Sequence, residues 1–423
     1  MNKSKFYLKW MLVSSLFAGF TACSDDDGPD GPELPGTTYT TDRCQVLALA
    51  TEAGNTGSSY EWTVTQSASD RFSLTGSGSR EVLFAAVDPG QYELTVTING
   101  SETETHQVTV NKESDPYKTY IDQVYDFRPA PGQFINDLPP AVEGDTYETV
   151  LRRANSYLAK EQGTLVSLGG FGGYVVVGFD HTIVNVDGRR DFRVLGNAFW
   201  ANANPNPGAS SRGGSCEPGV IMVAYDQNKN GQPDDNEWYE IKGAAYNMKS
   251  TVHNYEITYH RPDPDKVPVP GGGTGTVAFT DVEYIKWDDN QGGTGYLWQN
   301  NATNHSLNYW PLWLNDQETL TFSGTLLPAN AIDESGSGTY YVLYSFEYGY
   351  ADNAPNNDDE SAVDINWAVD GQGNFVHLPG IDFIKVYNGL NQQAGWLGET
   401  STEIAGASDL HLKDEFITTR STE

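Results

Sequence analysis

The sequence predicts an all-β protein: a small immunoglobulin-like β-sandwich followed by a larger jelly-roll β-sandwich with one peripheral helix. Two observations support this prediction. Short apolar or alternating runs recur along most of the 423 residues, and Gly, Asn and Pro turn signals separate them. A single stretch near the start of the larger unit has the apolar spacing of an amphipathic helix, and helical patterns are scarce after it.

The N-terminus predicts a lipoprotein signal peptide over residues 1–22. Three lysines precede the apolar stretch MLVSSLFAGF, which is too short to span a bilayer and is typical of a secretory signal. The stretch ends in FTAC, which resembles a bacterial lipobox with Phe20 in place of the usual Leu and Cys23 as the acylated residue. Plain secretion with a chance cysteine is the alternative.

Residues 23–36 predict an acidic tether. The run SDDDGPDGPELPG is solvated and broken by Pro and Gly, so it has no means of packing a core. Its acidic start resembles the export tag of Bacteroidetes lipoproteins. That resemblance implies a protein anchored by lipid to the outer membrane and facing the cell exterior.

Residues 37–111 predict the small β-sandwich. Asp88-Pro89-Gly90 and Asn99-Gly100 mark turns, and Trp62 is expected in the core. The runs expected to form strands are QVLALAT, SYEWTVTQ, EVLFAAV, QYELTVTI and THQVTV. YEWTV and DPGQYELTVT resemble PKD-like domains of Bacteroidetes surface proteins, which implies a spacer.

Residues 117–413 predict the large β-sandwich, after a linker at residues 112–116. Its helix is expected within GDTYETVLRRANSYLAKEQG, capped by Asp145 and stopped by Gly163. The expected strands are YVVVGF, DFRVLGNAF, GVIMVAY, HNYEITYH, TYYVLYSFEYGY and IDFIKVYNG. Several of them are apolar on both faces, which predicts central positions in a packed sandwich.

Longer stretches of this unit resemble a family of Bacteroidetes cell-surface lipoproteins. The resemblance lies in SLGGFGGYVVVGFDHTIVNVDGRRDFRVLGNAF, CEPGVIMVAYDQNKNGQPDDNEWYEI, NYWPLWLND, YGYADNAPNND and DFIKVYNGLNQQAGWLGETSTEI. It implies a galactose-binding-like sandwich, a fold that binds a sugar or small molecule at its loop tips or serves as scaffold. Some members of the family resemble accessory proteins of cobalamin transporters. Cys216 departs from the Ser expected before EPG.

The segment DQNKNGQPDDNE has the spacing of an EF-hand calcium loop. Hard oxygen donors alternate around a glycine that permits a left-handed turn, so one loop can wrap one Ca²⁺ ion. The expected ligands are Asp226, Asn228, Asn230, the Gln232 carbonyl, Asp234 and Glu237. The flanks GVIMVAY and EWYEI are strand-like, which favours a structural staple over a sensor; an acidic hairpin turn without an ion is the alternative.

A second candidate site is the aromatic stretch YLWQNNATNHSLNYWPLWLND. Indole and phenol faces stack on sugars and other flat ligands, while Asn and Asp fix hydroxyl groups. The expected ligand-binding residues are Trp298, Tyr309, Trp310 and Trp313. Large aromatic residues in an all-β protein are also typical of its core, which is the competing interpretation.

Charge and motifs narrow the function classes. The 57 acidic residues against 25 basic ones give a net charge of −32, which disfavours a nucleic-acid partner. No nucleophile-elbow or zinc motif occurs, and Cys44 and Cys216 are expected as free buried thiols, with a disulfide as the alternative. Asp187 and Asp191 could form a glycosidase pair or a charged turn, and residues 351–364 a second calcium site or a solvated loop.

Three functions remain. The first is a non-enzymatic surface protein that captures a glycan or a cobamide-like molecule for an outer-membrane TonB-dependent importer. The others are a structural or adhesive surface protein and a glycan hydrolase.

The lipid anchor gives the first testable expectation. The substitution Cys23→Ala should release the protein from the membrane, because it removes the thiol that carries the lipid. Protease treatment of intact cells should degrade the wild-type protein. Full protection of the wild-type protein would contradict exposure on the cell surface.

Overall fold

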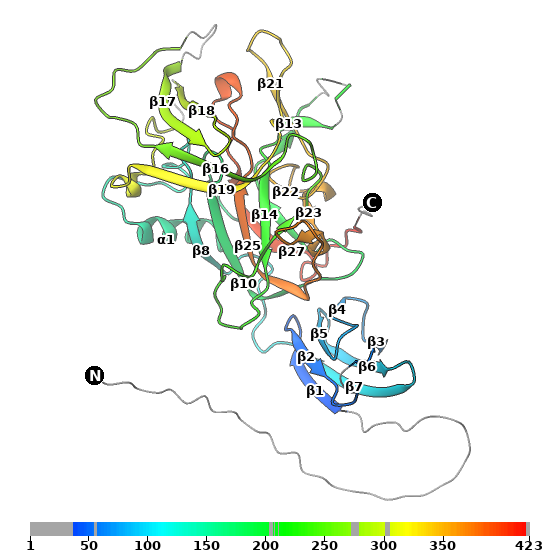
Figure 1. Cartoon of the computed structure of the whole chain (residues 1–423). Helices are drawn as coiled ribbons and strands as arrows, with labels where there is room; N and C mark the ends of the chain where they lie inside the picture. The colour runs from blue at the N-terminus through cyan, green and yellow to red at the C-terminus, as the bar shows by residue number, and fades with distance from the viewer. Residues whose placement is uncertain are drawn as a thin grey trace, which may run out of the picture.

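The computed structural model describes residues 37–54, 57–202, 206, 208–209, 211–271, 279–300 and 305–419 (Figure 1). The signal peptide, the acidic tether and Cys23 lie outside these residues. Within them the chain is β-structured with one α-helix, which confirms the predicted all-β class. No helix of the described part is long and apolar enough to cross a membrane.

The first seven strands form the two layers of the small sandwich. One sheet has the order β1-β7-β6-β3 and the other β2-β5-β4. Their bounds are β1 Thr37–Asp42, β2 Leu47–Ala50, β3 Tyr60–Gln66, β4 Phe72–Thr75, β5 Glu81–Ala86, β6 Gly90–Ile98 and β7 Glu102–Asn111. Strands β1 and β4, which are polar or short, were not predicted from the sequence.

The core of this sandwich contains Trp62, as predicted. Trp62 is 2% exposed and donates its indole N–H to the Ser79 carbonyl over 2.9 Å, so the ring is buried without losing its hydrogen bond. Asn99 and Gly100 both have positive φ, 52° and 74°, in the tight turn between β6 and β7. This is the Asn-Gly hairpin turn that the sequence predicts.

The large unit is organised around one sheet in the order β24-β15-β14-β25-β10-β8, with β22 also paired to β14. Every strand pair in it is antiparallel. The bounds are β8 Gln123–Arg128, β10 Tyr174–Val184, β14 Gly219–Ala224, β15 Trp238–Ile241, β22 Tyr350–Ala351, β24 Ala368–Val369 and β25 Gly380–Asn388. Residues on both faces of β10, β14 and β25 are buried, which agrees with their predicted central positions.

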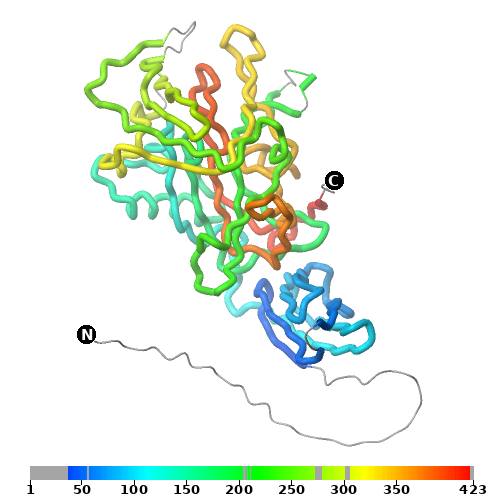
Figure 2. Tube along the Cα trace, in the orientation of Figure 1, coloured from blue at the N-terminus to red at the C-terminus, as the bar shows by residue number. Residues whose placement is uncertain are grey.

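Four further sheets complete this unit among the described residues: β18-β17-β16-β19, β12-β13-β21-β20, β23-β11-β27 and β26-β9. Their bounds are β9 Val166–Ser167, β11 Phe192–Leu195, β12 Phe199–Trp200, β13 Gly213–Ser215, β16 Val252–His260, β17 Phe279–Asp289, β18 Thr294–Asn300, β19 Thr319–Leu326, β20 Ala331–Asp333, β21 Tyr341–Tyr344, β23 Ala362–Val363, β26 Glu403–Ile404 and β27 Gly406–Asp409. Short 3-10 turns link them: η1 Leu312–Leu314, η2 Asp359–Ser361, η3 Ile365–Trp367 and η4 Gly395–Leu397. Figure 2 shows the chain passing once from the small unit to the large one.

The single α-helix, α1 (Tyr147–Leu158), is the predicted peripheral helix, and its cap differs from the prediction. Thr146 caps it by accepting a hydrogen bond from the Thr149 N–H, whereas Asp145 is occupied in an ion pair with Arg153. The helix ends before Gly163. Its buried side, which includes Val150 and Leu158, packs into the main core.

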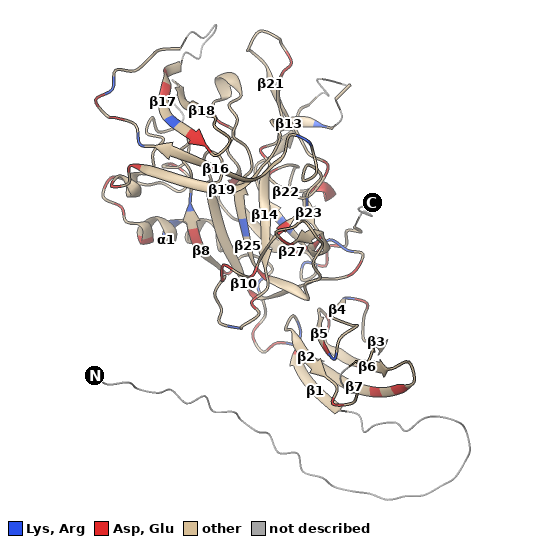
Figure 3. Ribbon diagram, viewed as in Figure 1, with Lys and Arg blue, Asp and Glu red and all other residues tan. Residues whose placement is uncertain are grey.

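The two units share an apolar contact. Cys44, Val46, Ala85 and Val87 of the small unit cluster with Val184, Val186 and Tyr225 of the large one. The Thr182 N–H donates to the Cys44 carbonyl over 3.1 Å, which extends the contact through the backbone. Cys44 and Cys216 are both free and buried, and burial raises the pKa of each thiol. Figure 3 shows the acidic residues spread over both units.

A buried His–Asp network lies beside this contact. His181 on β10 has its Nδ1 atom 2.8 Å from Asp180 and its Nε2 atom 2.9 Å from Asp409. Asp409 also accepts the His411 backbone N–H, and His411 contacts Asp191 at 2.9 Å. Burial lowers the pKa of His181, but the hydrogen bonds to the two carboxylates outweigh burial and raise this pKa to about 9.

This raised pKa predicts a pH-dependent stability. A folded-state pKa above the unfolded value of about 6.5 stabilises the fold fully below that pH, and the stabilisation is lost as the pH rises towards about 9. The loss should reach roughly 3 kcal/mol in the free energy of unfolding, measured by urea unfolding between pH 6.5 and 9. Asp409→Asn should flatten the slope, whereas Asp288→Asn, in the exposed His260–Asp288 pair, should keep it. Equal slopes in wild type and Asp409→Asn would contradict the assignment.

Candidate functional site

The predicted calcium loop is a hairpin excursion between β14 and β15. The two strands pair antiparallel on either side of it, with Ala224 opposite Trp238. Gly231, at the sixth position of the loop, has a φ of +71°, which is the left-handed turn expected there. The flanks are strands, as predicted, so no helix pair is present for an ion to open.

Asp226 organises the first half of the loop. Its two carboxylate oxygens accept the N–H groups of Asn230 and Gly231 at 3.0 and 2.7 Å. Asn228 and Asn230 each donate a side-chain N–H to one oxygen of Asp234, at 2.6 and 2.8 Å. The predicted side-chain ligands in this half therefore face one another in the described structure.

Glu237 closes the loop from its far end. It is 1% exposed, and its Oε1 atom accepts the Gln227 N–H over 3.0 Å. Its Oε2 atom is buried without a hydrogen-bond partner in the described structure. A buried carboxylate oxygen without a partner is costly, and a cation held in the loop would satisfy it.

The donor set fits Ca²⁺, and binding would require the loop to tighten. Carboxylate, amide and carbonyl oxygens are the ligands that this ion prefers. Among the described residues, however, the three carboxylates expected as ligands, Asp226, Asp234 and Glu237, do not all lie within 4.8 Å of one another. The two Asn side chains would also have to turn their oxygens, in place of their N–H groups, towards the ion. The loop has the ligands for calcium, but not yet the final coordination geometry.

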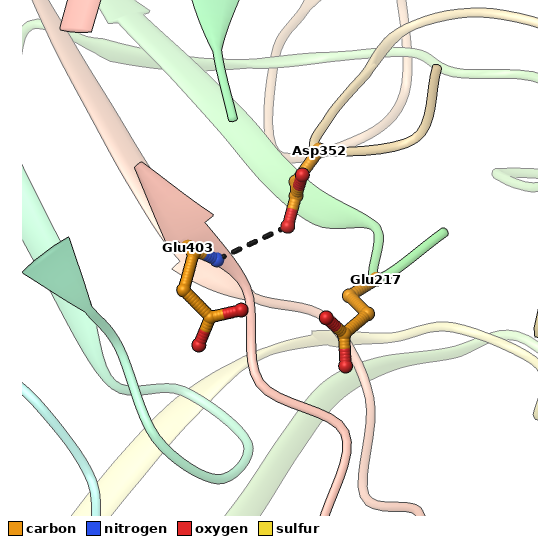
Figure 4. Close-up of side chains that lie close together, drawn as sticks. All are labelled: Glu217, Asp352 and Glu403. Atoms are coloured by element: carbon orange, nitrogen blue, oxygen red, sulfur yellow. Dashed lines mark hydrogen bonds between the residues drawn. The ribbon is translucent and has the colours of Figure 1, made fainter. Parts of the chain in front are cut away.

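A second cluster of carboxylates was not predicted as a site. The side chains of Glu217, Asp352 and Glu403 place ligand oxygens within 4.8 Å of one another (Figure 4). They come from three segments: the approach to β14, the end of β22 and the start of β26. Pairing of β14 with β22, with Gly219 opposite Ala351, brings the first two segments together. We call these three residues the acidic triad.

Backbone groups hold Asp352 in the triad. Its Oδ1 atom accepts the N–H groups of Asn197 and Ala198 at 2.8 and 2.7 Å, and its Oδ2 atom accepts the Glu403 N–H at 3.1 Å. Gly196 permits this close approach, because a Cβ atom there would lie 2.3 Å from Asp352 Oδ1. The carboxylate is therefore fixed by the chain around it.

The surroundings of the triad disfavour the ionised form of its carboxyl groups. Burial, followed by the charge of Glu403, raises the pKa of Asp352 to about 8. Burial also raises the pKa of Glu403 to about 7 and that of Glu217 well above its ordinary value. The ligand oxygens of Glu217 and Glu403 lie within 4.8 Å of each other, so the two carboxyl groups titrate together.

Two members of the triad, Glu217 and Glu403, line a cavity of about 320 Å³. Polar side chains dominate its described lining, which includes Glu399, Asn300 and His305 and no Lys or Arg. Glu399 accepts the Gln133 N–H at 2.5 Å, and burial raises its pKa as well. Trp396 also lines the cavity and is 42% exposed, so its indole is accessible. The cavity thus combines several hydrogen-bonding groups with one accessible aromatic ring.

A larger cavity of about 820 Å³ lies where the central sheet faces the β16–β19 sheet. Trp238, Tyr246, His253 and Lys385 are among its lining residues. Burial lowers the pKa of Lys385 and raises that of Glu240 to about 7. The larger cavity is therefore lined by both acidic and basic groups, whereas the described lining of the smaller cavity has acids and neutral polar groups.

The predicted aromatic ligand site needs correction. Tyr309 and Trp310 are 0% and 1% exposed in the core of the β16–β19 sheet, and Trp313 is 8% exposed in the main core. Their ring faces are covered by other side chains and cannot stack on a ligand. Trp298 is half-buried against Phe279, with ring centroids 5.0 Å apart. The neighbouring Asn308 accepts the Trp310 N–H over 3.0 Å, so it fixes the backbone of this irregular segment.

The other acidic candidates from the sequence were the pair Asp187 and Asp191 and the segment of residues 351–364. Asp191 is fully buried and accepts hydrogen bonds from the Val186 and Ile365 N–H groups, while Asp187 is exposed. The two therefore do not form an accessible glycosidase pair. Of residues 351–364, Asp352 belongs to the acidic triad. Cys216 is buried directly before Glu217.

Sequence reasoning missed Glu217, Glu399, Glu403 and the cavity that they share. No motif of closely spaced residues pointed to them, because segments far apart in the sequence supply these side chains. The short runs CEPG and GETSTE do place acids next to small residues, but such runs are common in an acidic chain. The acids within residues 351–364 were the one partial indication.

Comparison with known proteins adds little. No family model matches the chain, and no curated protein matches it. Among solved structures, the chain is similar to the solution structure of the PKD domain from KIAA 1837 protein. The identity is 22% over 22% of this chain and 98% of that chain, and the TM-score is 0.17.

The loop geometry predicts stabilisation by calcium. With free calcium about 100-fold above the dissociation constant, the ion bound in the loop should add roughly 2.7 kcal/mol to the free energy of unfolding. Thermal unfolding in calcium and in chelator measures this difference. Glu237→Gln should reduce it, because a neutral amide closes the coordination shell poorly, while Asp235→Asn, beside the ligands, should not. An equal calcium response in wild type and Glu237→Gln would contradict a loop ion.

Proposed function

We propose that this chain is a non-enzymatic, lipid-anchored surface protein that captures a polyhydroxylated ligand, with a glycan unit as the ligand class that its cavity fits best. The observation that carries the proposal is the 320 Å³ cavity, whose lining includes Glu217, Glu403, Glu399 and Trp396. Carboxylate and amide groups bind hydroxyl groups, and an accessible indole stacks on the apolar face of a sugar ring.

The cavity size separates the two ligand classes expected from the sequence. A volume of about 320 Å³ is near the lower end for small-molecule sites and suits one sugar residue. A cobamide is several times larger than a hexose. The cavity of about 820 Å³, with Trp238 and Tyr246 in its lining, is the better candidate for such a ligand.

The geometry of the triad favours binding over hydrolysis. Retaining glycosidases hold their two carboxyl groups about 5–5.5 Å apart so that the sugar fits between them. In the triad, the ligand oxygens of Glu217 and Glu403 lie within 4.8 Å of each other, which is shorter than that spacing. The proposed localisation is the outer face of a Bacteroidetes outer membrane, and the proposed partner of capture is a TonB-dependent importer.

Trp396→Ala tests the capture site. Removing the ring should weaken glycan binding about tenfold, as expected for the loss of roughly 1–1.5 kcal/mol of aromatic contact. The fold should be retained because the side chain is 42% exposed. Glycan arrays and a cobalamin binding assay would identify the ligand, and titration would give the affinities.

Two controls sharpen this experiment. Phe375→Ala removes another exposed aromatic ring, outside the described lining of both cavities, and should leave binding unchanged. Trp238→Ala alters the larger cavity. Binding lost in Trp238→Ala and kept in Trp396→Ala would move the site to the larger cavity, while release of reducing sugar by the wild-type protein would favour the hydrolase.

A further inference from the structure

The acidic triad has the composition of a cation site. Its donors are all oxygens, they converge within 4.8 Å, and three separate segments of the fold fix them. The described side chains that line the adjoining cavity include no Lys or Arg to balance the acids. Buried carboxylates in such proximity need shared protons or a bound cation.

Glu399 supplies an independent observation. Its side chain is buried, with 5% exposure, and it lines the same cavity as Glu217 and Glu403. Its Oε1 atom accepts the Gln133 N–H, but its Oε2 atom has no hydrogen-bond partner in the described structure. A bound cation or a water molecule can satisfy an oxygen left in this state.

Asn197 lies at the edge of the triad. Its backbone N–H donates to Asp352 Oδ1 over 2.8 Å, and its side-chain amide, turned over, donates N–H to both oxygens of the same carboxylate. Asn197 therefore positions Asp352.

We propose that Glu217, Asp352 and Glu403 bind a divalent cation, with calcium as the preferred ion and Glu399 as a supporting oxygen donor. The absence of nitrogen and sulfur from the triad argues against zinc and favours a hard cation. Calcium accepts irregular sets of oxygen ligands, while magnesium demands near-octahedral geometry. This site is separate from the loop at Asp226–Glu237, and its occupation requires no captured ligand.

The test counts bound ions on the purified protein without any glycan. After treatment with chelator, equilibrium dialysis against radioactive calcium should give two ions per chain in the wild type, one from the triad and one from the loop. Glu217→Gln and Asp352→Asn should each remove one ion or weaken its binding at least tenfold. Glu237→Gln should remove the loop ion and leave the triad ion in place.

Controls separate a lost ligand from a damaged fold. Glu240→Gln neutralises a buried acid outside the triad and should leave the ion count unchanged. Thermal unfolding adds a second measurement, in which the triad variants should gain less stability from calcium than the wild type does. In chelator, neutralising one acid stabilises the variant, because it relieves repulsion among the carboxylates. If Asp352→Asn fails to fold, Glu217→Gln decides, because its half-buried side chain lies at the cavity.

The outcomes separate this proposal from the others. A calcium count that is the same in wild type, Glu217→Gln and Asp352→Asn would overturn the triad site. A triad ion without any glycan binding would support the cation site and count against the capture function. A protein with one ion, lost in Glu217→Gln and kept in Glu237→Gln, would support the triad and refute the loop site.

Discussion

The pairing of β14 with β25 is the contact on which both candidate sites depend. β14 lies between β15 and β25 in the central sheet, with Val220 opposite Tyr387 and Ala224 opposite Phe383. Glu217 lies just before this strand and Asp226 just after it. Because a one-residue change of register would turn every side chain to the other face, this pairing fixes the acidic triad at one end and the loop at the other.

The large negative charge of the chain gives these two sites a common basis. Each gathers carboxylates that repel one another. A buried carboxylate oxygen without a hydrogen-bond partner in the described structure belongs to Glu237 in the loop, and another belongs to Glu399 in the cavity beside the triad. Outside a cell, millimolar calcium is available to offset such repulsion. If ions bind at the two sites as proposed, their binding energy would stabilise the fold through linkage. Acids that repel one another in the ion-free chain would then hold it together.

How well the sequence predicts a feature depends on how far apart along the chain its interacting residues lie. The Asn99-Gly100 turn, the position of helix α1 and the loop around Gly231 follow from neighbouring residues, and the structure shows each of them. The triad depends on strand pairing between distant segments, which one sequence does not reveal. Trp310 was misjudged for the same reason, because its pattern suits a binding surface and only the tertiary packing buries it.

The loop also contacts the small unit, which extends the role of a structural ion. Lys229, inside the loop and with a φ of 56°, donates its ammonium N–H to the Val46 carbonyl over 3.2 Å. Tyr225, directly before the loop, packs in the apolar cluster that both units share. A cation that tightens the loop would therefore order Lys229 and reduce the conformational freedom lost when the units pack together. In the proposed surface protein, the same ion would stiffen the connection between the tethered spacer and the unit that holds the capture cavity.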